Sequence, residues 1–584
     1  MPPPGRRLGT ELLPGLSLTK ALALVMGVWV TCTLIMFHQH SFVAVSRFDY
    51  TDQVLSSLPI HSLKLNHIAE IQTNAAQSVA FVPIEDNPRH PYALVLVANF
   101  YGSSGLYLFR PNNLRPNVQS LAVLQTECGH SWAVWQQGGR RWAAVANYCS
   151  KEKQKGVVVY ELESLTTSSQ TPDWGFKAAA VIAANGSSYV MHMQLPFGPG
   201  TKSVSGPGTP GSGSGSGVSS LNASNGSSGV QSWQDVLAIA EYGTGHWVLY
   251  GLEYTEDKGL VVTELQRTIL RGVASLALCR TGGSSGDGGV DGRGHAEIFM
   301  IGLSYYDKSF ATRSAVYRWD PVKRHFVVLQ VLATHGAHGA RCFTLRDGSP
   351  SATTTTTATA SDGSIGSNGS SSSGGDSDGD GNGNGGGGSL FLAIANSRQG
   401  ESFVANSTLW RYDPGSERFL LHQMIVTVGA HDVEYLQLPA APPARLGTRA
   451  GRVGHRSTSG GEQVDVLVFA NRGADQICSP SENNPLLTWV SERQRFEPAA
   501  HLAGLQCATG LATGRLAGNT LLLATGDRSE NGSTSGPLTH IWRVESAGGR
   551  GTGGSGRGRS GWDGGGRLGE GLAAGLGLGG TVRR

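Results

Sequence analysis

The stretch from Arg418 to Leu438 reads RFLLHQMIVTVGAHDVEYLQL and is the best guide to the fold. Apolar and polar side chains alternate on both sides of its Gly-Ala turn, a pattern typical of two short β-strands. After a Pro/Gly/Arg-rich interruption the chain continues as VDVLVFAN, which ends at Asn471, and a further apolar run ends near Trp489. Together these runs make a unit of four short strands separated by turns.

The same unit recurs along the chain. The copy immediately upstream reads HFVVLQVLATHGAHGARCFTL from His325 to Leu345, resumes as LFLAIAN up to Asn396 and closes at Tyr412. Five weaker copies bring the total to seven over about residues 58–545. A unit of four strands cannot bury both of its faces alone, so the seven copies predict an all-β fold, a seven-bladed β-propeller.

The third run of each copy is almost wholly apolar, as expected for a strand packed between neighbouring blades. In four copies this run ends in Ala-Asn, at Asn99, Asn147, Asn396 and Asn471. In the other three copies the Asn position holds Glu241, Ser304 and Gly526. We interpret the asparagines as structural residues that bond to nearby backbone at the strand end, the alternative being a contact site on the rim.

The motif HQMIVTVGAHDVEYL, the recurring Ala-Asn pair and the closing strand STLWRYD (Ser407–Asp413) resemble the EAR repeat (EPTP, epitempin) found in the LGI proteins. The resemblance implies a seven-bladed propeller in a secreted protein or an ectodomain. It is closest in the copies at 325–413 and 418–490. The chain shows no leucine-rich repeats, so the partners of that family are not transferred to it.

An apolar run near the N-terminus predicts the compartment. Residues 21–37 carry no charge, and Arg6, Arg7 and Lys20 precede them. This asymmetry predicts a cytoplasmic tail (1–20), a signal-anchor helix (21–37), a linker (38–57) and a lumenal or extracellular propeller, hence a single-pass type II membrane protein. A signal peptide cleaved near Ala44-Val45-Ser46 would give a secreted protein instead, and a buried apolar helix is the third alternative.

Low-complexity segments interrupt the repeats. Gly accounts for 83 of the 584 residues. Much of it lies in four segments near 198–229, 281–294, 349–389 and 439–461 and in a Gly/Arg-rich tail, 546–584. We predict that the four segments are loop insertions and that the tail is disordered, because long insertions add little to the entropy of loop closure. The net charge of +3, with 15% charged residues, gives no reason to expect a nucleic-acid partner.

The cysteines predict disulfides in an oxidising compartment. Equivalent positions of the repeat suggest the pairs Cys128–Cys149 and Cys478–Cys507, with buried free thiols as the alternative. We expect Cys279 and Cys342 to stay unpaired. Among six N-x-S/T sequons, Asn406 lies outside the low-complexity segments, and Asn185 and Asn531 are further glycosylation candidates.

Motifs for catalysis or metal binding are weak. The chain contains no HExxH and no CxxC, and we expect the histidines of the repeat to take turn or surface positions: His335, His338, His422 and His431. The GxSxG match at residues 282–286 lies in a Gly/Ser tract without the strand–turn–helix context of a nucleophile. Asp376, Asp378 and Asp380 match half of a calcium loop, but Gly387 stands where the loop needs a bidentate Glu. We therefore expect a solvated loop at these aspartates and no cofactor, with calcium binding as the alternative.

These observations favour a non-enzymatic binding or adhesion module, tethered to a membrane, that presents its rim or top face to a protein or glycan ligand. One alternative is a type II lumenal glycan-processing enzyme, which would need convergent carboxylates at the central channel. Asp432 is the candidate there, but the other turns hold no matching acid. A structural protein of the cell surface or matrix is a further alternative.

Overall fold

A computed structural model describes the repeat region as 28 strands in seven four-stranded antiparallel sheets. The described residues are 62–84, 91–111, 117–149, 156–164, 174–197, 232–281, 296–346, 388–439, 463–473, 484–502, 504–526 and 538–547. None of them forms a helix long and apolar enough to cross a membrane. The predicted signal-anchor, the low-complexity segments and the tail lie outside these residues or reach into them only at their edges.

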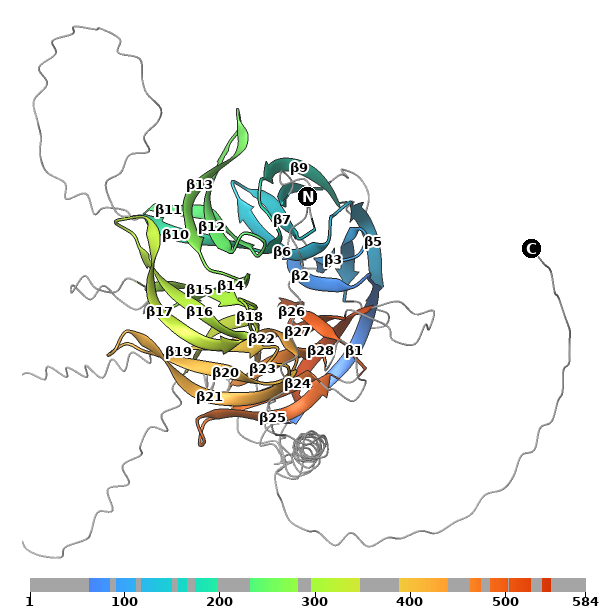
Figure 1. Cartoon of the computed structure of the whole chain (residues 1–584). Helices are drawn as coiled ribbons and strands as arrows, with labels where there is room; N and C mark the ends of the chain where they lie inside the picture. The colour runs from blue at the N-terminus through green and yellow to red at the C-terminus, as the bar shows by residue number, and fades with distance from the viewer. Residues whose placement is uncertain are drawn as a thin grey trace, which may run out of the picture. The chain divides into compact units, whose positions relative to one another are not determined.

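The sheets form seven blades, which we name A to G, and the strands of each blade are given below from the innermost to the outermost (Figure 1). Blade A comprises β2 (Ala76–Ile84), β3 (Tyr92–Asn99), β4 (Ser104–Arg110) and β5 (Asn117–Leu124). Blade B comprises β6 (Gly129–Gln137), β7 (Arg140–Asn147), β8 (Val157–Ser164) and β9 (Trp174–Ile182). Blade C comprises β10 (Ser187–Phe197), β11 (Ser232–Glu241), β12 (His246–Thr255) and β13 (Gly259–Ile269).

The remaining four blades complete the ring. Blade D comprises β14 (Val273–Arg280), β15 (Ile298–Ser304), β16 (Ala311–Asp320) and β17 (His325–His335). Blade E comprises β18 (Ala337–Leu345), β19 (Ser389–Asn396), β20 (Val404–Asp413) and β21 (Arg418–Val428). Blade F comprises β22 (Ala430–Pro439), β23 (Gln463–Asn471), β24 (Asn484–Val490) and β25 (Arg495–Leu502). Blade G comprises β26 (Ala508–Leu516), β27 (Asn519–Gly526), β28 (Leu538–Ala547) and β1 (Ser62–Gln72).

The predicted seven-bladed propeller is therefore confirmed, and the sequence repeat is offset from the blade by one strand. The first strand of each repeat is the outermost strand of the preceding blade. As a result β1, the first strand of the first repeat, pairs antiparallel with β28, and Gln72 lies opposite Leu538. Figure 1 shows the blue β1 lying against the red β28. The innermost strands of all seven blades contact one another in sequence around the ring, including β2 with β26.

The core lies between neighbouring blades. The second strand of each blade is buried on both faces, so that Leu94 through Ala98 of β3 are all 0% exposed. Aromatic side chains of the third strands fill the wedges between blades: Trp247 meets Tyr317 edge-on at 5.1 Å between ring centroids. Burial of this kind contributes about 25 cal/mol per Å² of apolar surface, which explains why one blade alone would not be stable.

The four insertions share one location in the blade. Each falls between the first and second strands of its blade, after β10, β14, β18 and β22. Because antiparallel strands alternate in direction, these connections all open at one end of the propeller, which we call the insert end. The ends of the second strands, including Asn99 and Asn147, lie at the opposite end.

The disulfides match the expectations only in part. Cys128 and Cys149, one of the two suggested pairs, form a disulfide. The expectation that Cys279 and Cys342 stay unpaired is wrong, because these two residues also form a disulfide. They lie on β14 and β18, and innermost strands of adjacent blades approach so closely at the axis that the two Cα atoms are 5.2 Å apart. Cys507 is disulfide-bonded as well; its suggested partner, Cys478, lies outside the described residues.

Candidate functional site

A β-bulge near the start of each innermost strand shapes one end of the central channel. In all seven blades the register with the second strand shifts at the second residue of the innermost strand. A bulge re-aims the side chain at that position and often lies at a functional site. The residues so placed are Gln77, His130, Ser188, Ala274, His338, His431 and Thr509.

Three of these seven residues are histidines that meet across the channel. The ring of His338 lies 3.4 Å from that of His431, centroid to centroid, and 6.2 Å from that of His130. His130 comes from blade B and His338 from blade E, so the channel is narrow at this level. The Nδ1 atom of His431 lies 2.9 Å from the backbone oxygen of Thr509. The expectation of turn or surface positions is therefore wrong for His338 and His431.

Burial keeps these histidines neutral. It lowers the pKa of His130 to about 4 and that of His431 to about 3, and it holds the pKa of His338 well below the usual value. The charge of Arg472 acts in the same direction on all three. At neutral pH the cluster thus offers uncharged imidazoles, each with one N–H donor and one nitrogen acceptor.

A second polar group lies farther along the same innermost strands. Asp432 and Glu434 are two residues apart on β22, so their side chains project from the same face of the strand. Asp432 accepts a hydrogen bond of 2.8 Å from the backbone N–H of Leu511, and Glu434 lies 3.3 Å from the guanidinium of Arg341. Burial, and secondarily Glu434, raises the pKa of Asp432 to about 7; burial also raises the pKa of Glu434. The second carboxylate beside Asp432 is Glu434 of the same strand, not a residue from the turn of another blade. The Asp-x-Glu spacing in the sequence could have identified it.

Aromatic residues from four of the seven blades border the histidine cluster. The residue that follows the second strand is aromatic in four consecutive blades, and we call these four residues the crown: Phe100, Tyr148, Tyr242 and Tyr305. Tyr148 lies 5.7 Å from His130 and 6.0 Å from Tyr242, and Tyr305 lies 5.3 Å from His338. Two further tyrosines next to the crown are well exposed, Tyr101 at 54% and Tyr306 at 42%.

The asparagines of the repeat lie at the same end of the propeller as the crown. The Asn99 carbonyl accepts the backbone N–H of Asn74, and its amide donates to the backbone oxygen of Ser103 at 2.7 Å. Asn396 bonds in the same way to backbone of His335 and Asn406. The Asn147 carbonyl accepts the backbone N–H of Glu127, and Asn471, whose backbone N–H donates to the Asn484 side chain, ends β23. The side-chain bonds of Asn99, Asn147 and Asn396 to backbone are the ones that a structural role requires.

The other candidate residues are scattered. Asn185 is exposed in the turn between β9 and β10, beside Gly243 at the crown end. Asn406 lies on β20 and is partly buried. The glycosylation candidate Asn531 and the calcium candidates Asp376, Asp378 and Asp380 lie outside the described residues.

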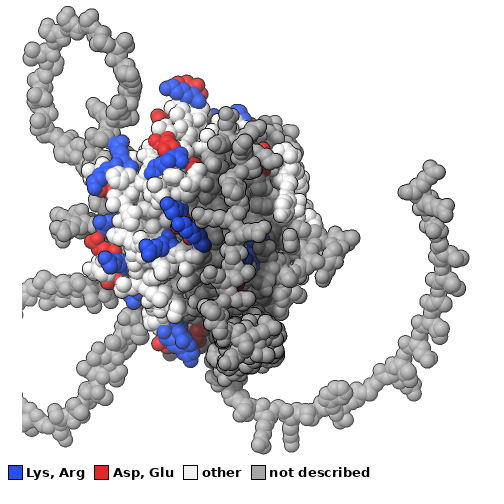
Figure 2. Space-filling view, viewed as in Figure 1, with Lys and Arg blue, Asp and Glu red and all other residues white. Residues whose placement is uncertain are grey.

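The outer surface carries charges of both signs side by side. Figure 2 shows basic and acidic groups next to one another on the visible part of the blades that the structure describes. Arg318 and Glu417, paired at 2.7 Å between Nη1 and Oε2, are one example of such neighbours of opposite charge. The outer strand β21 also exposes apolar side chains, among them Leu421 at 49% and Met424 at 60%. The rim is thus a second surface on which a partner could pack.

Comparison with known proteins gives one weak sequence match. No family model matches the chain. It is 26% identical over 122 residues to the mouse thrombospondin-type laminin G domain and EAR repeat-containing protein. The match spans 21% of this chain and 12% of that relative, so the chain corresponds to only a small part of the relative's length.

Solved structures are similar at low identity. A Lactobacillus plantarum protein aligns with a TM-score of 0.35 and 10% identity over 71% of this chain and 84% of its own. The S. cerevisiae core factor aligns with a TM-score of 0.38 and 6% identity over 86% of this chain and 63% of its own. By its own strand order the chain is a seven-bladed β-propeller, and about a fifth of its length has a weak similarity to an EAR repeat-containing protein.

Proposed function

We propose that this protein is a non-enzymatic binding module built on EAR-type repeats, which recognises a protein or glycan through the crown end of its propeller. The observation that carries the proposal is the crown itself, four aromatic residues at one repeat position in consecutive blades, with exposed Tyr101 and Tyr306 beside them. Aromatic side chains are enriched at binding surfaces because they bury a large area at little cost in conformational entropy.

The groups beneath the crown would add specificity. The neutral imidazole of His130 can donate or accept a hydrogen bond, and Arg472 adds a positive charge near the cluster. A flat apolar ring beside such donors suits the faces of sugar rings as well as a protein loop. The ligand therefore belongs to one of these two classes.

The compartment is part of the proposal. Two disulfides are defined and Cys507 is bonded too, which is usual for a protein that matures in an oxidising compartment. We infer a lumenal or extracellular propeller tethered by residues 21–37, in accord with the charge asymmetry around them. Protease protection in microsomes tests this orientation: the propeller should be protected, and its digestion from the cytosolic side would contradict the proposal.

The binding surface is tested with paired variants of the full chain on a glycan array and in pull-downs from the cell surface. Tyr148→Ala combined with Tyr305→Ala should reduce binding at least ~10-fold, since hot-spot aromatics typically contribute about 2 kcal/mol or more. Trp233→Ala, at the insert end and 52% exposed, is the matched control and should bind normally. Loss of binding in Leu421→Ala combined with Met424→Ala, with the crown variant unaffected, would move the site to the rim.

Asp432 and Glu434 favour a second candidate, the glycan-processing enzyme. They are the paired channel carboxylates that such an enzyme needs, and one of them has a pKa of about 7, suited to a general acid. Incubation of the full chain with glycoside substrates tests it. Turnover that disappears in Asp432→Asn would establish this alternative, whereas binding without turnover favours the binding module.

A further inference from the structure

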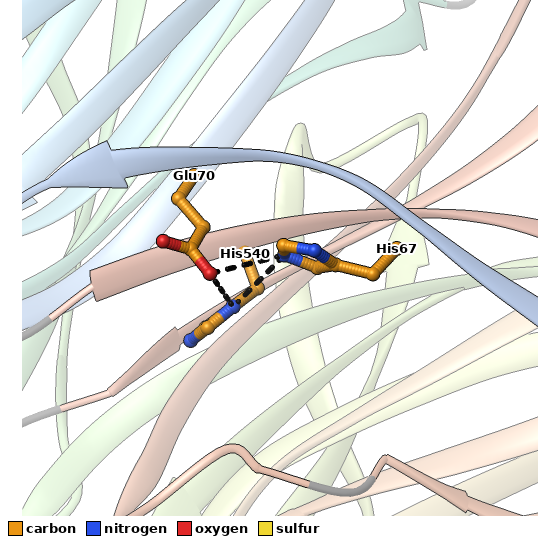
Figure 3. A group of neighbouring side chains, drawn as sticks. All are labelled: His67, Glu70 and His540. Carbon is orange, nitrogen blue, oxygen red and sulfur yellow. Dashed lines mark hydrogen bonds and ion pairs between the residues drawn. The ribbon is translucent and has the colours of Figure 1, made fainter. Parts of the chain in front are cut away.

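The closing blade carries a cluster of metal-ligand side chains that has no part in the crown. The Nε2 atom of His67 lies 3.2 Å from the Nδ1 atom of His540, and these nitrogens lie 3.5 Å and 3.6 Å from Oε1 of Glu70. Figure 3 shows the three side chains pointing toward one another, His67 and Glu70 from β1 and His540 from β28. Within the described residues this is the group of three such donors that converges closely enough to hold a metal ion.

A bulge in β1 creates the cluster. Residues three apart on a regular strand point to opposite faces. Between His67 and Ala69, however, the register with β28 shifts, so Ile68 is the extra residue. The bulge brings His67 and Glu70 to the same face, with Glu70 opposite His540 and His67 opposite Trp542.

The other six blades provide an internal comparison. Each has the same register shift between its third strand and its outermost strand. The residues there that correspond to His67, Glu70 and His540 include no second set of three metal ligands. In blades A to F these sets are Ser120, Val123 and Gly105; Ala178, Val181 and Val158; Glu264, Arg267 and Val248; Val328, Val331 and Ala315; Leu421, Met424 and Thr408; Pro498, His501 and Pro485. The repeat fold therefore does not require the two histidines and the glutamate.

We propose that His67, Glu70 and His540 bind one zinc ion that links the first strand of the propeller to the last. Zinc takes imidazole nitrogens and carboxylate oxygens at ~2.0–2.2 Å, so tetrahedral ligands lie ~3.3–3.6 Å apart, close to the three distances between these donor atoms. Two imidazoles and one carboxylate leave the fourth position for water.

The surroundings suit such a site. The His540 ring stacks on Trp542 at 5.2 Å, which fixes its orientation, and the His67 ring meets Trp542 edge-on at 5.8 Å. The side chains of His67 and Glu70 are 42% and 45% exposed, so an ion can enter from solvent. Because β1 and β28 are far apart in sequence, an ion between them would hold the ring closed. This role is independent of ligand binding at the crown.

The full chain, stripped of metal with a chelator, tests the proposal by zinc titration and thermal unfolding. Wild type should bind one zinc ion more than His67→Gln or Glu70→Gln, and its melting temperature should rise with zinc. Each variant should bind zinc at least ~100-fold more weakly at this site, as losing a ligand costs no less than losing a residue that supports one. Cobalt substitution should give the visible spectrum of a four-coordinate ion in wild type only.

His422→Gln is the matched control, because His422 is the bulge residue of the outermost strand of blade E. It should keep both the zinc stoichiometry and the thermal shift. Both substituted residues are well exposed, so the His67 and Glu70 variants should fold. Equal zinc binding in wild type and both variants, or a melting temperature that zinc and chelator leave unchanged, would overturn the proposal. The second result would mean that the three side chains only share hydrogen bonds.

Discussion

Histidine and carboxylate side chains in the central channel push the stability of the protein in opposite directions as pH changes. His431 has a pKa of about 3 in the folded protein, against about 6.5 for an ordinary histidine. Between pH about 6.5 and about 3 the unfolded chain binds a proton at this residue that the folded protein does not bind, so acidification destabilises the fold. Asp432, with a folded pKa of about 7, binds a proton in the folded state first, so it stabilises the fold as pH falls from about 7 to about 4.

His431→Gln should therefore flatten the loss of stability in acid. We expect the slope of unfolding free energy against pH, between about 6 and 4.5, to decrease by up to about 1.4 kcal/mol per pH unit, measured by denaturant titration. His130, His338 and Arg472 interact electrostatically with the His431 imidazole, and all three remain in the variant. Asp432→Asn should change the slope in the opposite sense. An unchanged slope in His431→Gln would mean that this imidazole titrates normally in the folded protein.

Gly339 is required by close backbone approach. A Cβ atom there would lie 2.7 Å from the Cα of Asp432 and 2.8 Å from the backbone oxygen of His431, because β18 and β22 touch at the axis. Gly339→Ala should destabilise the protein by about 1–3 kcal/mol in equilibrium unfolding. Gly415→Ala is the control, since its Cβ would meet nothing closer than 3.5 Å. Equal stability of the two variants would contradict this close packing of β18 against β22.

At the scale of the element, alternation and turns predicted the strands, whereas their grouping into blades depends on long-range pairing. The Gly-Ala turn before His431 marks the end of one blade and the start of the next, which the repeat itself does not reveal. The bulges were also missed, since a bulge is a property of two paired strands. For this reason the convergence of His130, His338 and His431 could not be predicted, although each residue is visible in the sequence.

The insertion in blade E should be dispensable for folding. Leu345 and Ser389 are direct partners across β18 and β19, and in blade B Gly138 and Gly139 connect the equivalent strands in a two-residue turn with positive φ values of 59° and 74°. Replacing residues 346–388 by Asn-Gly should leave the melting temperature unchanged or raise it. Closing the shorter loop costs less entropy, which adds up to about 3 kcal/mol to the free energy of unfolding.

An Ala-Ala replacement of the same residues is the control, and it should be less stable than Asn-Gly because both positions need positive φ. A fall of several degrees in the Asn-Gly variant would show that the removed segment packs against the propeller.

At the scale of the whole molecule, the disulfides differ in how much of the chain they constrain. Cys279–Cys342 joins blades D and E across 63 residues, whereas Cys128–Cys149 spans 21 residues. Loop-closure entropy then predicts that changing both Cys279 and Cys342 to Ala lowers the free energy of unfolding by about 4 kcal/mol. The same change at Cys128 and Cys149 should lower it by about 3 kcal/mol. Equilibrium unfolding of the two double variants measures the difference. A larger loss in the shorter loop would contradict this ranking, and non-reducing peptide mapping should first show both pairs.

The ring was predictable as a whole because seven copies of one pattern define a propeller even where single copies are degenerate. The closure by β1 follows from the offset between repeat and blade, and it brings His67 and Glu70 to His540. Neither the pairing of β1 with β28 nor the approach of His67 and Glu70 to His540 has a local signal in the sequence. Function is less accessible for the same reason: the crown consists of single residues from four blades, each unremarkable in its own repeat.

Whether the crown end is the binding surface can be determined by site-specific photocrosslinking in the full chain on the producing cell. A benzoylphenylalanine replaces Tyr101, 54% exposed beside the crown, or Trp233, 52% exposed at the insert end. We predict adducts with one and the same ligand from position 101, suppressed by Tyr148→Ala combined with Tyr305→Ala, and none with that ligand from position 233. Adducts from position 233 that the crown substitutions leave intact, with none from position 101, would contradict binding at the crown.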